Sequence, residues 1–136
     1  MFWYITCMPK FKFGKLVRDK IVDNQIASGA KPKYHQLDDD KHKQALILKI
    51  IEEAQEITQA KPEELAGEIA DVQQAIDDLK RKYKLTDRDI AKAQKTKLNK
   101  AGAFREGLYV DYVEVDKNNK WVEYYRKNAD RYPEIK

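Results

Sequence analysis

Residues 45–79 read ALILKIIEEAQEITQAKPEELAGEIADVQQAIDDL. On both sides of Pro62, apolar residues recur at intervals of three and four positions, which is typical of amphipathic helices. Pro62 suits the first turn of a helix, and Glu63 and Glu64 favour the positive N-terminal end of the helix that follows. Because the connection around Pro62 is short, we expect the two helices to be antiparallel neighbours.

Each of these helices carries two acids, one turn apart, along one edge of its apolar face. They are Glu53 and Glu56 in the first helix, and Glu68 and Asp71 in the second. Packing the helices face to face brings four carboxylates together, and such a group repels itself unless cations bind. Oxygen ligands suit Mg²⁺ or Mn²⁺ rather than Zn²⁺ or copper. Surface acids that pair with lysines give the same local pattern, so it is the repetition on adjacent helices that favours a metal site.

Two more helices flank this pair in the sequence. Residues 15–28 have helical spacing and are followed by Gly29, where a left-handed cap is expected. The aspartates at 38–40 offer N-cap oxygens for the helix that continues into residues 45–79. Thr86 can cap a fourth helix, which we expect to end before Gly102.

The C-terminal part changes to a strand-like pattern. Residues 108–115 and 121–125 are rich in aromatic and β-branched side chains and flank an Asp-Lys-Asn-Asn-Lys turn, which predicts a β-hairpin. We therefore expect a mainly α protein, an antiparallel helical bundle with a small C-terminal β-hairpin. The expected single domain covers residues 1–136, with an N-terminal extension at 1–14, a helical core at 15–102 and the hairpin at 108–125.

The composition narrows the class of protein. The chain has 136 residues, of which 42% are hydrophobic and 37% charged, and it has one cysteine, so an internal disulfide is excluded. No stretch is long and apolar enough for a transmembrane helix, and we expect a cytoplasmic protein with no membrane partner. The net charge is +4, but the basic residues are interleaved with 23 acids, so nucleic acid is not favoured as a partner.

Several motifs are similar to those of one enzyme family. Residues 51–56, IEEAQE, followed by EIAD at 68–71, resemble the E-E-x-x-E … E-x-x-D signature of MazG-like, all-α nucleoside triphosphate pyrophosphatases. Residues 15–21, KLVRDKI, resemble the opening of one branch of that superfamily, which is related to phosphoribosyl-ATP pyrophosphohydrolases. A basic segment that ends in G-G-F in that branch ends here in Gly102-Ala103-Phe104, so one glycine is replaced. The likeness covers residues 15–113.

The resemblance implies an activity and a set of ligands. The expected reaction is Mg²⁺-dependent cleavage of a nucleoside triphosphate between its α and β phosphates, which yields a monophosphate and pyrophosphate. The metal ligands would be Glu53, Glu56, Glu68 and Asp71, and Glu52 would be an outer acid that supports them. Either Glu53 or Glu56 would activate the attacking water, unless the metal itself does so. Removal of non-standard nucleotides is one role consistent with this reaction, and a phosphoribosyl-nucleotide substrate also stays open.

Basic residues in the similar segments are candidates to hold the phosphates, with solvated surface cations as the alternative. These candidates are Arg18, Lys20, Lys97, Lys100 and Arg105. Relatives of this kind imply a homo-oligomer, a dimer or tetramer, that buries apolar helix surface. The alternative function is a non-catalytic helical protein that senses nucleotides or binds nucleic acid.

Overall fold

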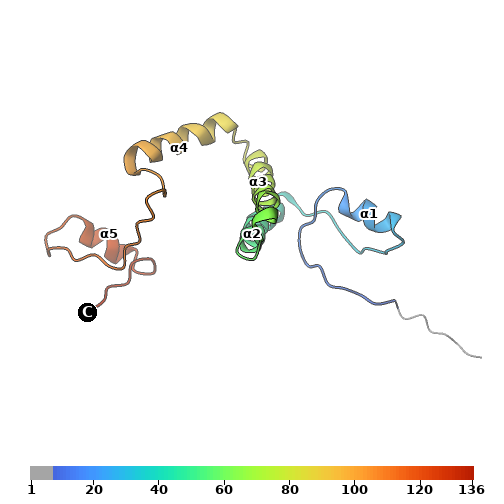
Figure 1. Ribbon diagram of the computed structural model, residues 1–136, viewed down its shortest axis with the longest axis horizontal. Helices are drawn as coiled ribbons and strands as arrows, with labels where there is room; N and C mark the ends of the chain where they lie inside the picture. Colours follow the sequence, from blue (N-terminus) through green and yellow to red (C-terminus); the bar gives the residue numbers. More distant parts are fainter. Residues whose placement is uncertain (1–7) are drawn as a thin grey trace, which may run out of the picture. The chain divides into compact units, whose positions relative to one another are not determined.

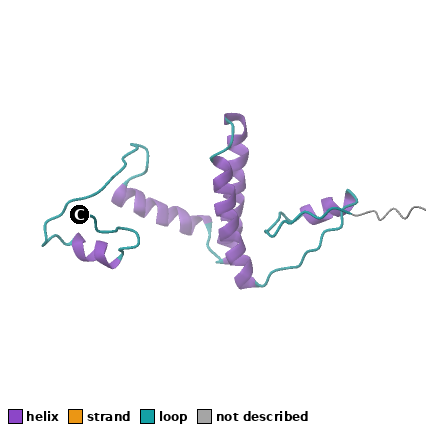
Figure 2. Ribbon diagram, turned by 90° about the horizontal axis from the view of Figure 1, so that it is seen from below, coloured by secondary structure: helices purple, strands orange, loops and turns teal. Residues whose placement is uncertain are grey.

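The computed structural model describes residues 8–136, and every regular element in that range is helical (Figures 1 and 2). The elements are α1 (Ile21–Ala27), α2 (Asp39–Ile57), the 3₁₀ turn η1 (Pro62–Glu64), α3 (Leu65–Lys82), α4 (Asp87–Ala101) and α5 (Trp121–Lys127). The chain divides into two compact units, of which the first ends at Gln94 and the second covers Lys95–Lys136. The prediction of a mainly α protein is confirmed. Residues 1–7 of the predicted N-terminal extension lie outside the described residues.

Helices α2 and α3 begin where local sequence chemistry predicts. The Asp38 side chain accepts a hydrogen bond of 2.9 Å from the Lys41 backbone N–H and so caps α2. Pro62 occupies the first turn of η1, where its missing N–H costs no helical hydrogen bond. The helix α3 then continues directly from η1 at Leu65, with Glu68 in its first turn.

The helices α2 and α3 pack against each other (Figure 1), and they are antiparallel, because the start of α2 contacts the end of α3. Asp39, in the first turn of α2, forms an ion pair of 2.6 Å with Lys82 in the last turn of α3 and one of 2.9 Å with Lys43. The hydrogen bonds from these two lysines lower the pKa of Asp39 from 3.8 to about 2. Among the described residues only Leu46 of α2 and Ala75 of α3 are buried hydrophobic side chains, so this pair holds the core.

The pair formed by α2 and α3 has an acidic side and an apolar side. On a helical projection the acids of α2 and α3 lie to one side of the buried line, and a set of exposed apolar residues lies to the other side of both helices. The exposed apolar set, here called the apolar face, comprises Ile47, Leu48, Ile51, Leu65 and Ile69. Between 38% and 66% of each of these residues is accessible to solvent, so this side of both helices exposes large apolar side chains.

Helix α1 is shorter than predicted at its start and ends as predicted. Residues 15–20 are not helical, although the helix was expected to begin at Lys15. At the other end, the Ala30 N–H donates to the Gln25 carbonyl and the Gly29 N–H donates to the Ile26 carbonyl, both at 3.0 Å. This is the Schellman pattern, and Gly29 has the positive φ of 89° that it requires.

Helix α4 also follows the prediction. The Thr86 hydroxyl accepts a hydrogen bond from the Asp89 N–H, and the Asp89 carboxylate accepts one from the Thr86 N–H, which forms a reciprocal cap. Gly102, with a φ of 81°, follows the last helical residue. No helix in residues 8–136 combines the length and the apolar character needed to cross a bilayer.

The predicted β-hairpin is wrong. Residues 8–136 contain no strand, and α5 replaces the expected second strand at residues 121–125. The Asn119 side chain accepts a hydrogen bond of 2.8 Å from the Trp121 N–H at the start of this helix. Trp121 and Tyr124, three positions apart, place their ring centroids 5.7 Å from each other, which agrees with helical spacing. The spacing of Trp121, Tyr124 and Tyr125 therefore suits a helix, and the hydrogen bond to Asn119 favours the start of that helix.

Candidate metal centre

Three acids converge where α2 faces the start of α3. Glu53 of α2 and Glu68 and Asp71 of α3 each offer a carboxylate oxygen, and these three oxygens lie within 4.8 Å of one another. All three side chains are partly buried. Glu68 and Asp71 are one turn apart on α3, and the antiparallel packing brings Glu53 against them. We call these three residues the acidic triad.

Glu56, the fourth predicted ligand, is exposed and does not belong to the acidic triad. Its charge nevertheless acts on the triad, because it is among the carboxylates that raise the pKa of Glu68. Partial desolvation is the largest cause of that raised pKa, followed by the charges of Asp71, Glu56, Glu53 and Glu64. The ionised form of Glu68 is therefore in an unfavourable environment, which a nearby positive charge would relieve.

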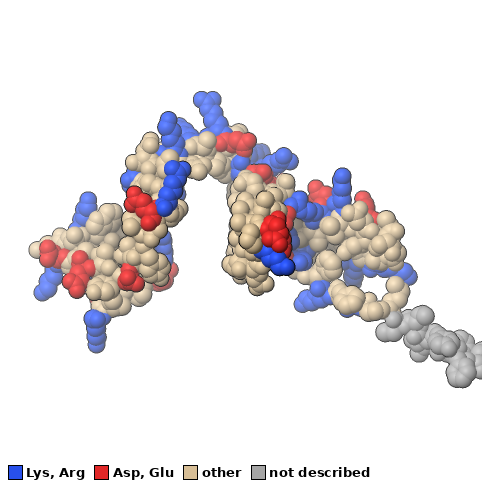
Figure 3. Space-filling view, in the orientation of Figure 1, with Lys and Arg blue, Asp and Glu red and all other residues tan. Residues whose placement is uncertain are grey.

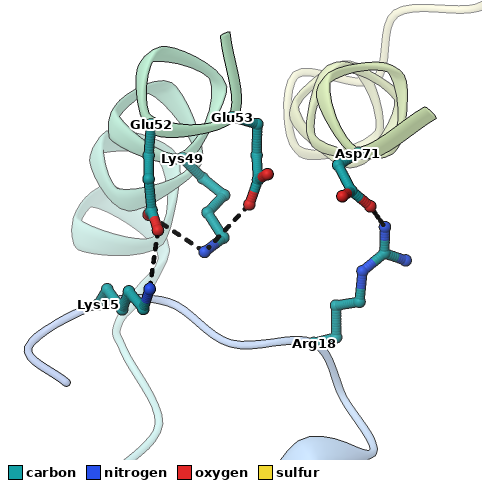
Figure 4. Close-up of polar contacts among 6 residues, drawn as sticks. All are labelled: Lys15, Arg18, Lys49, Glu52, Glu53 and Asp71. Carbon is teal, nitrogen blue, oxygen red and sulfur yellow. Dashed lines mark hydrogen bonds and ion pairs between the residues drawn. The ribbon is translucent and has the colours of Figure 1, made fainter. Parts of the chain in front are cut away.

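Basic residues surround the triad without reaching all of it (Figure 4). Arg18, from the segment before α1, contacts Asp71 with 2.5 Å between Nη2 and Oδ1. Lys49, one turn before the acids on α2, lies 3.5 Å from Glu53. Within the described residues, Glu68 makes no ion pair with a lysine or arginine, so one triad carboxylate lacks a direct positive partner.

Glu52, predicted as the outer acid, forms ion pairs with two lysines. Lys15 contacts it at 2.9 Å and Lys49 at 3.1 Å. The hydrogen bond from Lys15 is the main cause of the lowered pKa of Glu52, and partial burial opposes it. Glu52 thus anchors the segment before α1 to the acid-bearing edge of α2.

Lys15 and Lys49 are not among the site residues predicted from the sequence. Lys49 precedes Glu52 by three positions and Glu53 by four, and this spacing is the signal for helical ion pairs. Lys15 lies in the KLVRDKI segment, but only tertiary packing brings its side chain to Glu52. These contacts also explain the late start of α1, because residues 15–18 cross the acid-bearing edge in a non-helical conformation.

The other predicted phosphate ligands belong to different parts of the chain. Lys20 is exposed at the start of α1, and the structure gives its side chain no ion pair with described residues. Lys97, Lys100 and Arg105 belong to the second unit and are exposed. Of the two candidates in the first unit, Arg18 makes an ion pair with a triad carboxylate, and Lys20 does not. The role of the other four stays a prediction.

The donor set fits a hard divalent cation. All three triad ligands are carboxylate oxygens, with no histidine or cysteine among them, and Mg²⁺ and Mn²⁺ prefer such ligands. In the wider cluster, five acids (Glu52, Glu53, Glu56, Glu68 and Asp71) accompany three cations (Lys15, Arg18 and Lys49). The acids of this cluster therefore outnumber its cations, which favours the binding of a further cation.

Glu68→Gln is expected to raise the melting temperature of the metal-free protein at pH 7. A group whose pKa is raised by folding stabilises the fold below its ordinary value of 4.5 and loses that contribution as the pH rises. The gain should therefore be present at pH 7 and absent at about pH 3.5, where the carboxyl is protonated in both states. Thermal unfolding followed by circular dichroism at both pH values measures it.

Glu63→Gln is the matched control, because it removes the same charge from η1 at a residue outside the triad. It should not raise the melting temperature. Excess Mg²⁺ should raise the melting temperature of the wild type more than that of Glu68→Gln, since the ion binds only the folded cluster. A lower melting temperature for Glu68→Gln, with the Mg²⁺ effect intact, would show that Glu68 is a structural acid.

Comparisons of the chain with protein-family models, with curated proteins and with solved structures gave no match.

Proposed function

We propose that the protein is a Mg²⁺-dependent nucleotide pyrophosphohydrolase, which cleaves the bond between the α and β phosphates of a nucleoside triphosphate. The acidic triad carries this proposal. Three carboxylates from two antiparallel helices lie within 4.8 Å of one another, beside a segment that supplies an arginine and a lysine. Carboxylates next to phosphate-binding cations are the side chains that metal-assisted phosphoanhydride hydrolysis requires.

The acidic residues would have two separate roles in the reaction, metal binding and acceptance of a proton. Glu53, Glu68 and Asp71 would hold the metal, which when bound supplies positive charge to the phosphate oxygens. Glu56 is exposed beside the triad and is free of ion pairs with the described residues, so it can accept a proton from an attacking water. Glu53, the other candidate for this base, already forms an ion pair of 3.5 Å with Lys49, so its carboxylate is less free to contact a water.

The likeness to MazG-like pyrophosphatases supports the same proposal. The residues that carry it, IEEAQE at 51–56 and EIAD at 68–71, include all three members of the triad. On this proposal α2 and α3 form half of an antiparallel helical bundle. Two helices with only Leu46 and Ala75 buried do not make a self-sufficient core, so the other half has to come from elsewhere.

We propose that a second copy of the chain supplies the other half of the helical bundle. The apolar face lies opposite the acids, so two copies can pack these faces together and leave both acidic edges accessible. A layer of two helices packed on an identical layer gives a four-helix bundle with a two-fold axis, which is the commonest symmetry of homo-oligomers.

One observation favours a non-catalytic rival. Arg18, Lys15 and Lys49 already pair with three of the acids, and such networks also occur as purely structural features. The rival would bind nucleotides or nucleic acid through cations alone. On the face drawn in Figure 3, however, the basic residues of each unit are interspersed with acids and do not form one extended patch. Extended basic patches are what nucleic-acid binding favours.

The test is a product assay over a panel of nucleoside triphosphates with Mg²⁺, in which pyrophosphate is distinguished from orthophosphate. We expect equal amounts of monophosphate and pyrophosphate from at least one member of the panel, and none in excess chelator. A phosphoribosyl nucleotide belongs in the panel, since the resemblance leaves that substrate open. Release of orthophosphate alone, or of no product from any nucleotide, would contradict the proposal.

A further inference from the structure

The segment before α1 bonds to the acid-bearing edge at two points. Lys15 contacts Glu52 of α2 at 2.9 Å, and Arg18 contacts Asp71 of α3 at 2.5 Å (Figure 4). Only the second contact involves the acidic triad, because Glu52 is not a member of it. Arg18 is therefore placed where its positive charge and a metal ion act on the same carboxylate.

We propose that Arg18 is an internal counter-ion of Asp71 that competes with the metal and is released toward the substrate phosphates when a metal binds. The role in phosphate binding rests on the proposed function, whereas the competition rests on the Arg18–Asp71 ion pair and on metal binding by the acidic triad. A guanidinium within hydrogen-bond distance of a carboxylate lowers the affinity of that carboxylate for any second cation, because the two positive charges repel each other. The metal would then weaken the Arg18 contact by the same free energy.

Arg18 is better suited to this exchange than the other cations of the cluster. Lys49 belongs to the same helix as Glu52 and Glu53 and stays within one turn of both. Arg18 lies in a non-helical segment, and 58% of its side chain is exposed, so it can leave Asp71 without disturbing a helix. A guanidinium also binds phosphate through two parallel hydrogen bonds, which an ammonium group cannot do.

The proposal predicts opposite effects of one substitution on two ligands. Arg18→Gln should bind Mg²⁺ about three to five times more tightly than the wild type, which corresponds to the strength of a solvent-exposed ion pair. At saturating Mg²⁺, the same variant should bind inorganic pyrophosphate more weakly, by about tenfold, because a charge-assisted contact is lost. Both affinities are measured by isothermal titration calorimetry on the full chain.

Two further variants isolate the cause. Arg81→Gln removes an arginine ten residues further along α3, about 15 Å from Asp71 by the helical rise, and should leave the Mg²⁺ affinity within twofold of the wild type. Arg18→Lys keeps the charge and should stay close to the wild type for Mg²⁺, while it binds pyrophosphate more weakly. Melting temperatures are recorded for all variants, so that misfolding is recognised.

The release itself is visible by NMR. The guanidinium Nε–H signal that is present in the wild type and missing in Arg18→Gln should move when Mg²⁺ is added without nucleotide. An Arg18→Gln variant that binds Mg²⁺ equally or more weakly, or an Arg18 signal that Mg²⁺ does not move, would overturn the competition. An unchanged pyrophosphate affinity would overturn the release toward phosphates. Because the Mg²⁺ titrations contain no nucleotide, the competition can hold even if no nucleotide is hydrolysed.

Discussion

Replacement of Glu53 by Gln or of Asp71 by Asn is expected to slow pyrophosphate release by about a hundredfold to a thousandfold, the range seen when one electrostatic contributor to a transition state is removed. Each substitution nearly keeps the shape of the side chain and removes one of three converging negative charges. The metal would be held by two carboxylates rather than three. Initial rates at saturating Mg²⁺ and nucleotide measure the loss, and calorimetry with Mg²⁺ alone measures the accompanying loss of affinity.

Asp78→Asn is the matched control for Asp71→Asn. Asp78 lies two turns further along the same side of α3, about 10 Å from Asp71 by the helical rise, and it accepts a hydrogen bond from Gln74. It should retain the wild-type rate within a factor of about two. Full turnover by Glu53→Gln or Asp71→Asn, or by the wild type in excess chelator, would rule out the proposal that the carboxylates bind a catalytic metal.

The central helices could be predicted because several local signals agree there. The apolar period, the Asp38 cap and the proline at the first turn of η1 all specify α2 and α3, and the observed bounds follow them closely. The same helical projection that predicts the packing also predicts which acids meet. It predicts that four acids meet, of which Glu53, Glu68 and Asp71 do lie together, whereas Glu56 is exposed and outside the group.

The C-terminal part could not be predicted in the same way. Residues 121–125 combine β-branched and aromatic side chains, which favour a strand, with aromatic residues at positions 121, 124 and 125, which suit one face of a helix. A short apolar run does not distinguish these periods. The deciding interaction, the hydrogen bond from the Trp121 N–H to the Asn119 side chain, depends on a residue that was assigned to the turn.

The counter-ions of the acids were beyond sequence reasoning for a different reason. Lys49 pairs with Glu52 and Glu53 through ordinary helical spacing, which a search for ion pairs would find. Arg18 and Asp71 are 53 residues apart, and no periodicity connects them. Only the fold shows that the Arg18 guanidinium already contacts one carboxylate of the acid cluster. A metal ion at that carboxylate would therefore compete with Arg18.

The apolar face of α2 and α3 leads to a second prediction, which concerns the oligomeric state of the protein. Ile51 of α2 and Ile69 of α3 are 50% and 51% exposed, although both belong to helices that hold the buried residues of the first unit. Apolar side chains of this size each contribute about 1.5–3 kcal/mol when they are fully buried, so covering both helices would add substantially to stability. In a symmetric dimer every residue of the interface counts twice, which doubles the effect of a single substitution.

The wild type is therefore expected to be a homo-oligomer at about 10 µM, and Ile51→Asp is expected to be a monomer whose subunit affinity is at least about a hundredfold weaker. A charge placed in the apolar face would be buried twice without a partner. Light scattering coupled to size-exclusion chromatography measures the mass, and circular dichroism confirms that the helices persist. Ile69→Asp, on α3, should dissociate the oligomer in the same way. Ile26→Asp is the control, because Ile26 is 52% exposed on α1, away from the apolar face. A monomeric wild type, or an oligomer that survives both Ile51→Asp and Ile69→Asp, would show that something other than a second copy covers this face.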